Sequence, residues 1–147
     1  MPTSFLEGEM VKVKGGCLCG SSRYESDSDP IVSAVCHCKD CQKHSGSVFG
    51  LYVGIPKNGL KTSGQGFKTF EGSGGSGSYF HRIFCSNCGS SLYAAIELAP
   101  DLYFIHAGTL DDATWVKPEM QAWATKQLPC ATLTGEVATF DGNLPSG

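Results

Sequence analysis

The sequence predicts a small, mainly β fold built from antiparallel sheets, and three observations support this prediction. Five short segments are rich in aromatic or β-branched residues and are bounded by turn residues, as strands usually are. Helical periodicity is scarce along the 147 residues. Seven of the eight cysteines gather in three tight clusters. A small sheet with few helices gains folding free energy from a bound metal, so these clusters suit such a fold.

The expected strands are residues 21–25, 48–53, 78–84, 91–96 and 102–108. Residues 39–45, within the first gap between them, are predicted to form one or two turns of helix. Residues 111–115 are expected to form a short turn, in which Asp111 and Asp112 serve as turn or cap residues. Residues 72–78 consist of Gly and Ser alone, so we expect a mobile surface loop there.

Composition and charge exclude several classes of protein. The net charge is −3 and the eleven Lys and Arg residues are scattered, so the basic patch typical of nucleic-acid binding is missing and no nucleic-acid partner is expected. No apolar run approaches the ~20 residues that span a bilayer, so no membrane association is expected. Residues 1–8 lack a basic start followed by an apolar stretch, which predicts a cytoplasmic protein without a secretory signal. Structural disulfides are rare in that compartment.

The three cysteine clusters favour metal binding over disulfide bonds. They are Cys17 with Cys19, then Cys36, Cys38 and Cys41, and finally Cys85 with Cys88. A disulfide between cysteines one or two residues apart would close a very small, strained ring, whereas such pairs easily share a metal. A thioredoxin-like redox role for the last pair is the alternative, but no βαβ pattern surrounds it and Gly89 follows it, as in a zinc knuckle.

The number of thiols predicts two Zn²⁺ ions per chain with different roles. A structural zinc takes four protein ligands, whereas a catalytic zinc keeps one position for water or substrate. Glycines around the first pair allow a tight turn that aims both sulfurs at one ion, about 2.3 Å away. We therefore assign Cys17, Cys19, Cys85 and Cys88 to a closed structural site that joins early and late parts of the sheet.

The central cluster supplies only three thiols and predicts an open, catalytic zinc site. Cys36, Cys38 and Cys41 lie within six residues and can surround one ion on a single turn. A thiolate-rich zinc is a weak Lewis acid that readily accepts a further thiolate. It would hold a substrate thiol as the nucleophilic thiolate, although the pKa of a free thiol is about 8.5.

A closed central site is the alternative, with His37, His44 or Cys130 as fourth ligand. His37 lies between two cysteines of the cluster, so its side chain is expected to point away from the ion. His44 follows Cys41 by one helical turn, which makes it a candidate for either a fourth ligand or a nearby proton donor. Nothing else completes the site locally, which favours the open form.

Other residues have two interpretations each. Arg82 could bind a substrate carboxylate or could pair with an acid on the surface of a strand. Phe49 and Tyr52 could line a pocket beside the central zinc, although strand alternation favours core packing. His106 lies on an apolar strand and is expected to be a hydrogen-bonded core histidine. Cys130, outside the clusters, is expected to be a buried, inert thiol.

The ordered motifs resemble one known family. They are Gly-Cys-Leu-Cys-Gly at residues 16–20, Cys-His-Cys-Lys-Asp-Cys-Gln-Lys at 36–43, Phe-Cys-Ser-Asn-Cys-Gly-Ser at 84–90 and Gly-Thr-Leu-Asp-Asp at 108–112. In these motifs the chain is similar to the glutathione-dependent formaldehyde-activating enzyme family, which includes centromere protein V. The resemblance covers residues 15–123. The chain departs from the family pattern at two places. Residues 72–78 are expected to form a longer loop rich in Gly and Ser, and Pro129-Cys130 stands where members often carry a Pro-Trp pair.

The resemblance implies both a fold and an activity. It implies a β-tent fold stapled by zinc, in a single zinc-binding domain over residues 1–147 with a core at about 15–125. The activity implied is that of a zinc-dependent carbon–sulfur lyase, similar to S-(hydroxymethyl)glutathione synthase. Its partners would be a small-molecule thiol, glutathione or another, and formaldehyde or a related carbonyl compound. In that reaction His44 is our candidate proton shuttle. The alternative is a non-catalytic zinc module that binds a protein partner.

Overall fold

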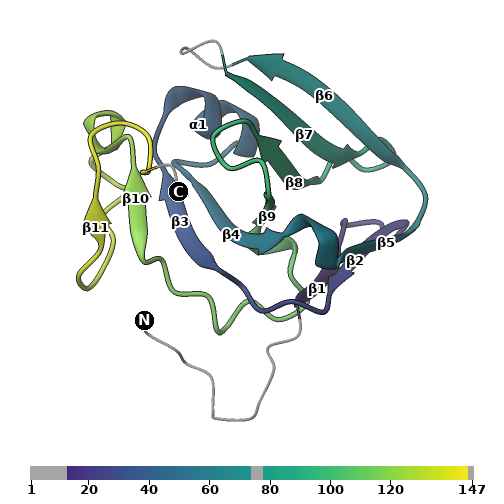
Figure 1. Ribbon diagram of the computed structural model, residues 1–147. Coiled ribbons are helices and arrows are strands. Elements are labelled where there is room, and N and C mark those ends of the chain that lie inside the picture. Colours follow the sequence, from purple (N-terminus) through teal and green to yellow (C-terminus); the bar gives the residue numbers. More distant parts are fainter. Residues whose placement is uncertain (1–12, 74–77, 146–147) are drawn as a thin grey trace.

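The computed structural model describes residues 13–73 and 78–145 and confirms a mainly β fold (Figure 1). A small sheet contains three strands in the order β1-β2-β5, with bounds Val13–Gly16, Ser22–Ser26 and Leu60–Gly64. A larger sheet contains eight strands in the order β11-β10-β3-β4-β9-β8-β7-β6. Neighbouring strands run antiparallel, as expected, except that β10 is parallel to both β3 and β11.

The strands of the larger sheet are β3 Val32–Cys36, β4 Gly50–Pro56, β6 Phe67–Ser73, β7 Tyr79–Cys85, β8 Ser91–Ile96, β9 Leu102–His106, β10 Met120–Ala122 and β11 Ala138–Thr139. The helical elements are α1 Lys39–Ser45 and the 3₁₀ turns η1 Lys57–Gly59, η2 Ala107–Thr109 and η3 Ala124–Lys126. Within the described part of the chain, no helix has the length and apolar character needed to cross a membrane.

The five predicted strands correspond to β2, β4, β7, β8 and β9, and the predicted helix coincides with α1. The predicted turn at 111–115 is also present, and the Asp112 carboxylate accepts hydrogen bonds from the backbone and hydroxyl of Thr114. The predicted glycine-serine loop is at odds with the structure at its start, because β6 continues through Ser73. Residues 74–77 of that loop lie outside the described residues.

The helix α1 begins and ends with clear capping interactions. The Sγ of Cys38 accepts a hydrogen bond from the backbone N–H of Cys41 at 3.3 Å, so a cysteine serves as the N-cap. Gly46 ends the helix with a φ of 69°, and its N–H donates to the carbonyl of Gln42 at 2.9 Å. These caps fix the short helix and hold Cys38 and Cys41 on the same turn.

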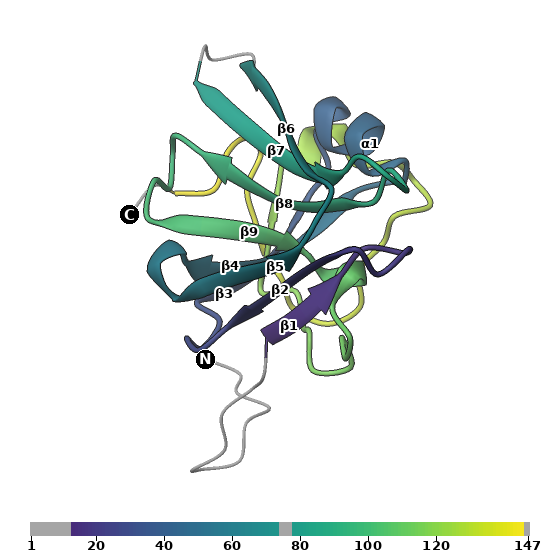
Figure 2. The ribbon, with the colours of Figure 1, turned by 90° about the vertical axis from the view of Figure 1, so that its right-hand side faces the viewer.

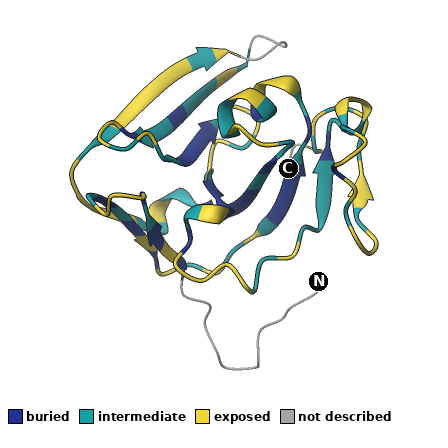
Figure 3. Ribbon diagram, turned by 180° about the vertical axis from the view of Figure 1, so that it is seen from behind, coloured by how far each residue is buried: buried dark blue, intermediate teal, exposed yellow. Residues whose placement is uncertain are grey.

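The core lies between the two sheets. Val53, Ile55 and Ile105 point from the larger sheet toward Val13 and Tyr24 of the small sheet, and all five are buried. In Figure 2, strands β1 and β2 of the small sheet lie below strands β7, β8 and β9 of the larger sheet. Exposed residues instead concentrate on the outer strand β6, whereas central strands such as β4 and β8 are mostly buried (Figure 3).

The opposite face of the larger sheet lines a cavity of about 890 Å³. Arg82, Ala94 and Phe104 are aligned across β7, β8 and β9 by the strand register, and all three line this cavity. Tyr52 and Ala34 continue the same face onto β4 and β3. Helix α1 contributes further lining residues, so the cavity extends from the sheet to the helix.

Candidate metal centres and cavity

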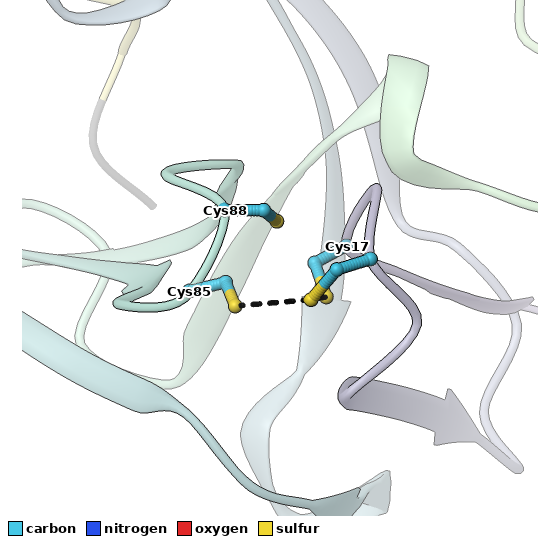
Figure 4. A group of neighbouring side chains, drawn as sticks. Cys17, Cys85 and Cys88 are labelled. Atoms are coloured by element: carbon cyan, nitrogen blue, oxygen red, sulfur yellow. Dashed lines mark hydrogen bonds between the residues drawn. The ribbon is translucent and has the colours of Figure 1, made fainter.

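The first candidate metal centre joins two distant turns of the chain. Cys17 and Cys19 lie on the β1–β2 connection, and Cys85 and Cys88 lie at the end of β7 and in the turn after it. The four sulfur atoms lie within 4.8 Å of one another. Figure 4 shows Cys85 and Cys88 on one turn facing Cys17 across the gap between the two sheets. The structure therefore brings together the four cysteines that the spacing assigned to one site.

Local hydrogen bonds shape this centre. The backbone N–H of Cys17 donates to the carbonyl of Ser22 at 3.0 Å, and the N–H of Ser22 donates to the Cys17 sulfur at 3.3 Å. The hydroxyl groups of Ser22 and Ser21 lower the pKa of the Cys85 thiol to about 5. Gly89, with a φ of 80°, turns the chain after the second pair. These donors favour the thiolate, which is the form that binds a metal.

The second candidate centre lies beside the cavity. Cys36 is the last residue of β3, Cys38 caps α1, and Cys41 is in the first turn of that helix. Their sulfur atoms lie within 4.8 Å of one another, and all three residues line the cavity. Hydrogen bonds from the thiols of Cys36 and Cys41 lower the pKa of Cys38 to about 2, and the Cys36 pKa is raised because its thiol is held as a donor to Cys38. The three thiols are thus close enough together to bind one metal cation, which would replace their protons.

A buried tyrosine supports this trio. The hydroxyl of Tyr52 donates a hydrogen bond to the sulfur of Cys41 at 3.2 Å, and both side chains are buried. Tyr52 also lines the cavity, which agrees with the interpretation of Tyr52 as a wall of a pocket beside the central cluster. Phe49 does not line it, because its ring packs edge-on against His37 with a centroid distance of 5.7 Å.

Among residues 13–73 and 78–145, no histidine or carboxylate joins either cysteine cluster. His37 is fully buried and points elsewhere, with Nε2 2.8 Å from Oε1 of Gln121. Cys130 lies outside both clusters and is exposed, so the expectation of a buried thiol was wrong. Exposure follows from its position in the irregular segment after η3 rather than in a strand. The central cluster thus offers three sulfur ligands and the other cluster four.

Two further histidines pack together behind Tyr52, of which His44 is half-buried and His106 is buried. The rings of His44 and His106 lie 5.3 Å apart, and the His106 ring lies 4.8 Å from that of Tyr52. Burial lowers the pKa of each to about 4, helped by the nearby positive charge of Arg82, so both are neutral at pH 7. The Nε2 atoms of both have no hydrogen-bond partner among the described residues. His106 is buried as expected, but the expected hydrogen bond at this atom is missing.

Arg82 lies on the cavity face of β7 and is only 8% exposed. Its guanidinium stacks on Phe80, with Cζ 4.1 Å from the ring centroid. In the described part of the chain no carboxylate pairs with it, so the interpretation as a surface ion pair was wrong. Sequence alone did not decide the role of Arg82 or of Tyr52. The sequence offered only their place on two predicted strands, and it is the strand register that puts both on one face of the sheet.

The donor atoms of both centres fit zinc. Both sets consist of cysteine sulfur alone, which soft or borderline metals such as zinc prefer, whereas magnesium and calcium take oxygen ligands. Four sulfurs match a closed tetrahedral site and three match a site with one free position. All cysteines in the structure are free thiols, consistent with metal binding rather than disulfides.

Comparison with known proteins places these features in one family. A family model described as glutathione-dependent formaldehyde-activating enzyme matches residues 12–126. An "uncharacterized lyase" of Schizosaccharomyces pombe is 30% identical over 67% of this chain and 68% of its own length. The "Putative glutathione-dependent formaldehyde-activating enzyme" of Podospora anserina is 27% identical over 74% of this chain. The chain spans 53% of the length of that second relative.

A solved structure shows the same fold. The crystal structure of a Rhodobacter sphaeroides protein superposes with a TM-score of 0.54 at 18% sequence identity. It covers 67% of this chain, and the match includes 87% of the Rhodobacter chain. At this identity the likeness concerns the fold alone.

Proposed function

Because the chain belongs to the glutathione-dependent formaldehyde-activating enzyme family, we propose that it is a zinc-dependent carbon–sulfur lyase. Its reaction would join a thiol, glutathione or another, to formaldehyde or a related carbonyl compound, and reverse that step, as S-(hydroxymethyl)glutathione synthase does. The observation that carries this proposal is the trio Cys36, Cys38 and Cys41, which offers three sulfurs beside a cavity without a fourth protein ligand among the described residues.

We propose two zinc ions with separate roles. Cys17, Cys19, Cys85 and Cys88 would hold a structural ion, since these four thiols close a tetrahedral site and tie the end of β7 to the β1–β2 connection. Cys36, Cys38 and Cys41 would hold the catalytic ion. The resemblance also supports a β-tent fold in a single domain. The free thiols support a cytoplasmic location, since they persist in a reducing compartment.

In this proposal the chain binds and orients the reactants. Zinc bound by the trio would supply a lowered thiol pKa, so that the substrate sulfur is nucleophilic at pH 7. The cavity holds the carbonyl compound next to that sulfur and limits its exposure to water. Tyr52 donates a hydrogen bond to Cys41 and fixes the position of that ligand. As the sulfur–carbon bond forms, the carbonyl π electrons move to oxygen, which takes up the proton that the thiol gave away.

His44 is our candidate for the transfer of this proton. Burial lowers its pKa to about 4, so the ring is neutral but only weakly basic at pH 7, and its protonated form would readily give the proton to the reacting oxygen. It does not line the cavity but packs against His106, which in turn packs against Tyr52. A water molecule in the cavity would have to connect His44 with the reacting oxygen.

One experiment tests the proposed reaction directly. Exchange between formaldehyde plus a thiol and their adduct is followed by NMR, with and without the zinc-loaded protein. Zinc-edge X-ray absorption, recorded on the same samples, averages over both ions, so we expect about 3.5 sulfurs and 0.5 light atoms per zinc, from four sulfurs at one ion and three sulfurs plus a light atom at the other. Adding the thiol should replace that light atom with sulfur. Cys130→Ser is the matched control for Cys41→Ser, since Cys130 lies outside both clusters. Zinc shells that no thiol perturbs would instead favour a non-catalytic module that binds a protein partner.

A further inference from the structure

Arg82 is a buried cation without a partner of opposite charge among the described residues. Its cross-strand neighbours are Phe70 on β6 and Ala94 on β8, neither of which can neutralise it. None of the ion pairs among the described residues includes Arg82. The Arg82 guanidinium instead stacks on the aromatic ring of Phe80. Burying an uncompensated charge is costly, so such a group in a cavity is usually a binding group. A guanidinium matches a carboxylate through two parallel hydrogen bonds.

The walls of the cavity next to Arg82 are apolar. Strands β3, β8 and β9 of the sheet contribute small, branched or aromatic side chains to its lining, namely Val32, Ala34, Ala94, Ile96 and Phe104. Its volume of about 890 Å³ is in the upper part of the usual range for small-molecule sites, roughly 300–1,000 Å³. This space greatly exceeds what formaldehyde needs, so most of it must accommodate the other reactant.

The remaining charges around the cavity cancel. They belong to Lys39, Asp40, Glu97 and Lys126, which are all exposed, and they comprise two positive and two negative groups. Water screens exposed charges of this kind, so they contribute little to binding. Apart from the cysteine sulfurs that would bind zinc, Arg82 is therefore the one buried charge among the described residues that line the cavity.

We propose that this cavity binds a mainly apolar thiol that carries a single carboxylate, with Arg82 holding the carboxylate and the sulfur lying at Cys36, Cys38 and Cys41. This substrate class rests on the proposed function, which places the reacting sulfur at those cysteines. Glutathione fits the cavity less well, because it carries two carboxylates, an ammonium group and two amides. Against apolar walls those amides would lose their hydrogen bonds to water without replacement.

The first test uses a probe that cannot react. Hexanoate, hexan-1-ol and hexylammonium share one chain and differ only in the end group, so they separate charge recognition from apolar binding. Each is titrated into the full-length, zinc-loaded protein and followed by NMR shifts of backbone amides on β7, β8 and β9. We expect hexanoate to bind about tenfold more tightly than hexan-1-ol and hexylammonium to bind weakest, because only the carboxylate can form a charge-assisted hydrogen bond with the guanidinium. Equal affinities of hexanoate and hexan-1-ol would overturn the proposal.

Variants locate the recognition at Arg82. We expect Arg82→Gln to weaken hexanoate by about tenfold while hexan-1-ol is unaffected, and Arg82→Lys to give an intermediate value. Ala94→Leu leaves every charge in place but fills part of the cavity beside the guanidinium. It should therefore weaken the binding of both hexanoate and hexan-1-ol. Lys68→Gln removes a positive charge from an exposed position on β6 and is the matched control. Should Arg82→Gln fail to fold, Arg82→Lys and Ala94→Leu carry the test.

Zinc content distinguishes a competing role for Arg82. The guanidinium could instead offset the negative charge of a zinc held by three thiolates. In that case Arg82→Gln would lose zinc from the central cluster yet bind hexanoate as the wild type does, which would overturn the proposal. Unchanged zinc content together with weakened hexanoate binding supports it.

A second assay separates this proposal from the lyase function. Exchange with formaldehyde is compared for 6-mercaptohexanoate and glutathione, and we expect 6-mercaptohexanoate to have the lower KM. Arg82→Gln should raise that KM by about tenfold with little change in kcat. If hexanoate binding depends on Arg82 but no thiol is exchanged, the lyase function fails and the carboxylate site stands. If 6-mercaptohexanoate is exchanged equally by wild type and Arg82→Gln, the substrate class fails and the lyase function stands.

Discussion

The hydroxyl of Tyr52 donates a hydrogen bond to the sulfur of Cys41 across 3.2 Å, linking strand β4 to the first turn of helix α1. A hydrogen bond of this kind stabilises a thiolate and fixes the direction of its lone pairs. The outer partners of a metal ligand commonly change affinity or activity by 10- to 100-fold when they are removed. Tyr52 therefore connects the buried sheet to the behaviour of the central cluster.

The first prediction follows from this contact. We expect Tyr52→Phe to fold and keep its structural zinc, but to lose about tenfold in lyase activity because Cys41 is no longer held and stabilised. Activity and zinc content are measured on the same preparations. The matched control is Tyr24→Phe, which removes a hydroxyl that bonds Thr109 at 2.7 Å on the core side of the sheet. Equal loss of activity in both variants would show that Tyr52 acts through general stability.

The second prediction separates the two cysteine clusters. Replacing Cys17 or Cys85 with Ser should give unfolded or insoluble protein, because metal binding there connects parts of the chain 66 or more residues apart and contributes folding free energy. Replacing Cys36 or Cys41 with Ser should leave a folded chain with about half of the zinc. Circular dichroism and metal analysis measure both properties. Similar damage from both sets of variants would contradict the division into structural and catalytic sites, and Cys130→Ser serves as control.

The grouping of the cysteines could be predicted from the sequence, because much of it depends on local spacing. Cysteines two or three residues apart must lie close together whatever the fold, and their total number suggested sites of four and three ligands. The pairing of Cys17 with Cys85 needed one further inference, which the structure supports by bringing the two turns together. Strands with alternating or apolar character, such as β4 and β8, were also predictable.

The remaining features depend on sheet topology, which sequence patterns do not reveal. Strands β5 and β6 are almost wholly exposed, so they lack the alternation that marks a half-buried strand. The short strand β10 depends on parallel pairing with distant β3, and β11 in turn pairs in parallel with β10. For the same reason Arg82 and Tyr52 remained undecided, because only the order β4-β9-β8-β7 brings them onto one cavity face.

The third prediction concerns metal release. If both clusters bind zinc as proposed, a mild chelator should remove one ion before the other, because the central cluster offers three thiols whereas the other cluster offers four. The circular dichroism spectrum should stay that of a β protein after the first ion is lost, since Cys38 and Cys41 belong to the short helix α1 and its cap and only Cys36, the last residue of β3, lies in a strand. Zinc release is followed with a colorimetric indicator. Simultaneous loss of both ions together with unfolding would mean that the two sites are equivalent.

The last prediction concerns His106 and the dependence of stability on pH. Burial lowers its pKa from 6.5 to about 4, so the folded state keeps the ring neutral while the unfolded chain takes up a proton as the pH falls below 6.5. Stability is therefore unaffected by this group above pH 6.5, declines as the pH falls from 6.5 to 4, and changes no further below 4. At pH 5 the loss should be about 2 kcal/mol, since one pKa unit corresponds to about 1.4 kcal/mol.

His106→Phe retains a ring beside Tyr52 and removes this titration. In urea unfolding of wild type and variant, both zinc-loaded, the free energy of unfolding of the wild type should therefore fall relative to that of the variant as the pH falls from 6.5 to 4, because only the wild type carries the His106 titration. Acid release of zinc affects both proteins alike and cancels in the difference. The ring proton signals of His106 should titrate with a midpoint near 4 in the folded wild type. A midpoint near 6.5 would mean that the ring reaches water, in conflict with its 8% exposure.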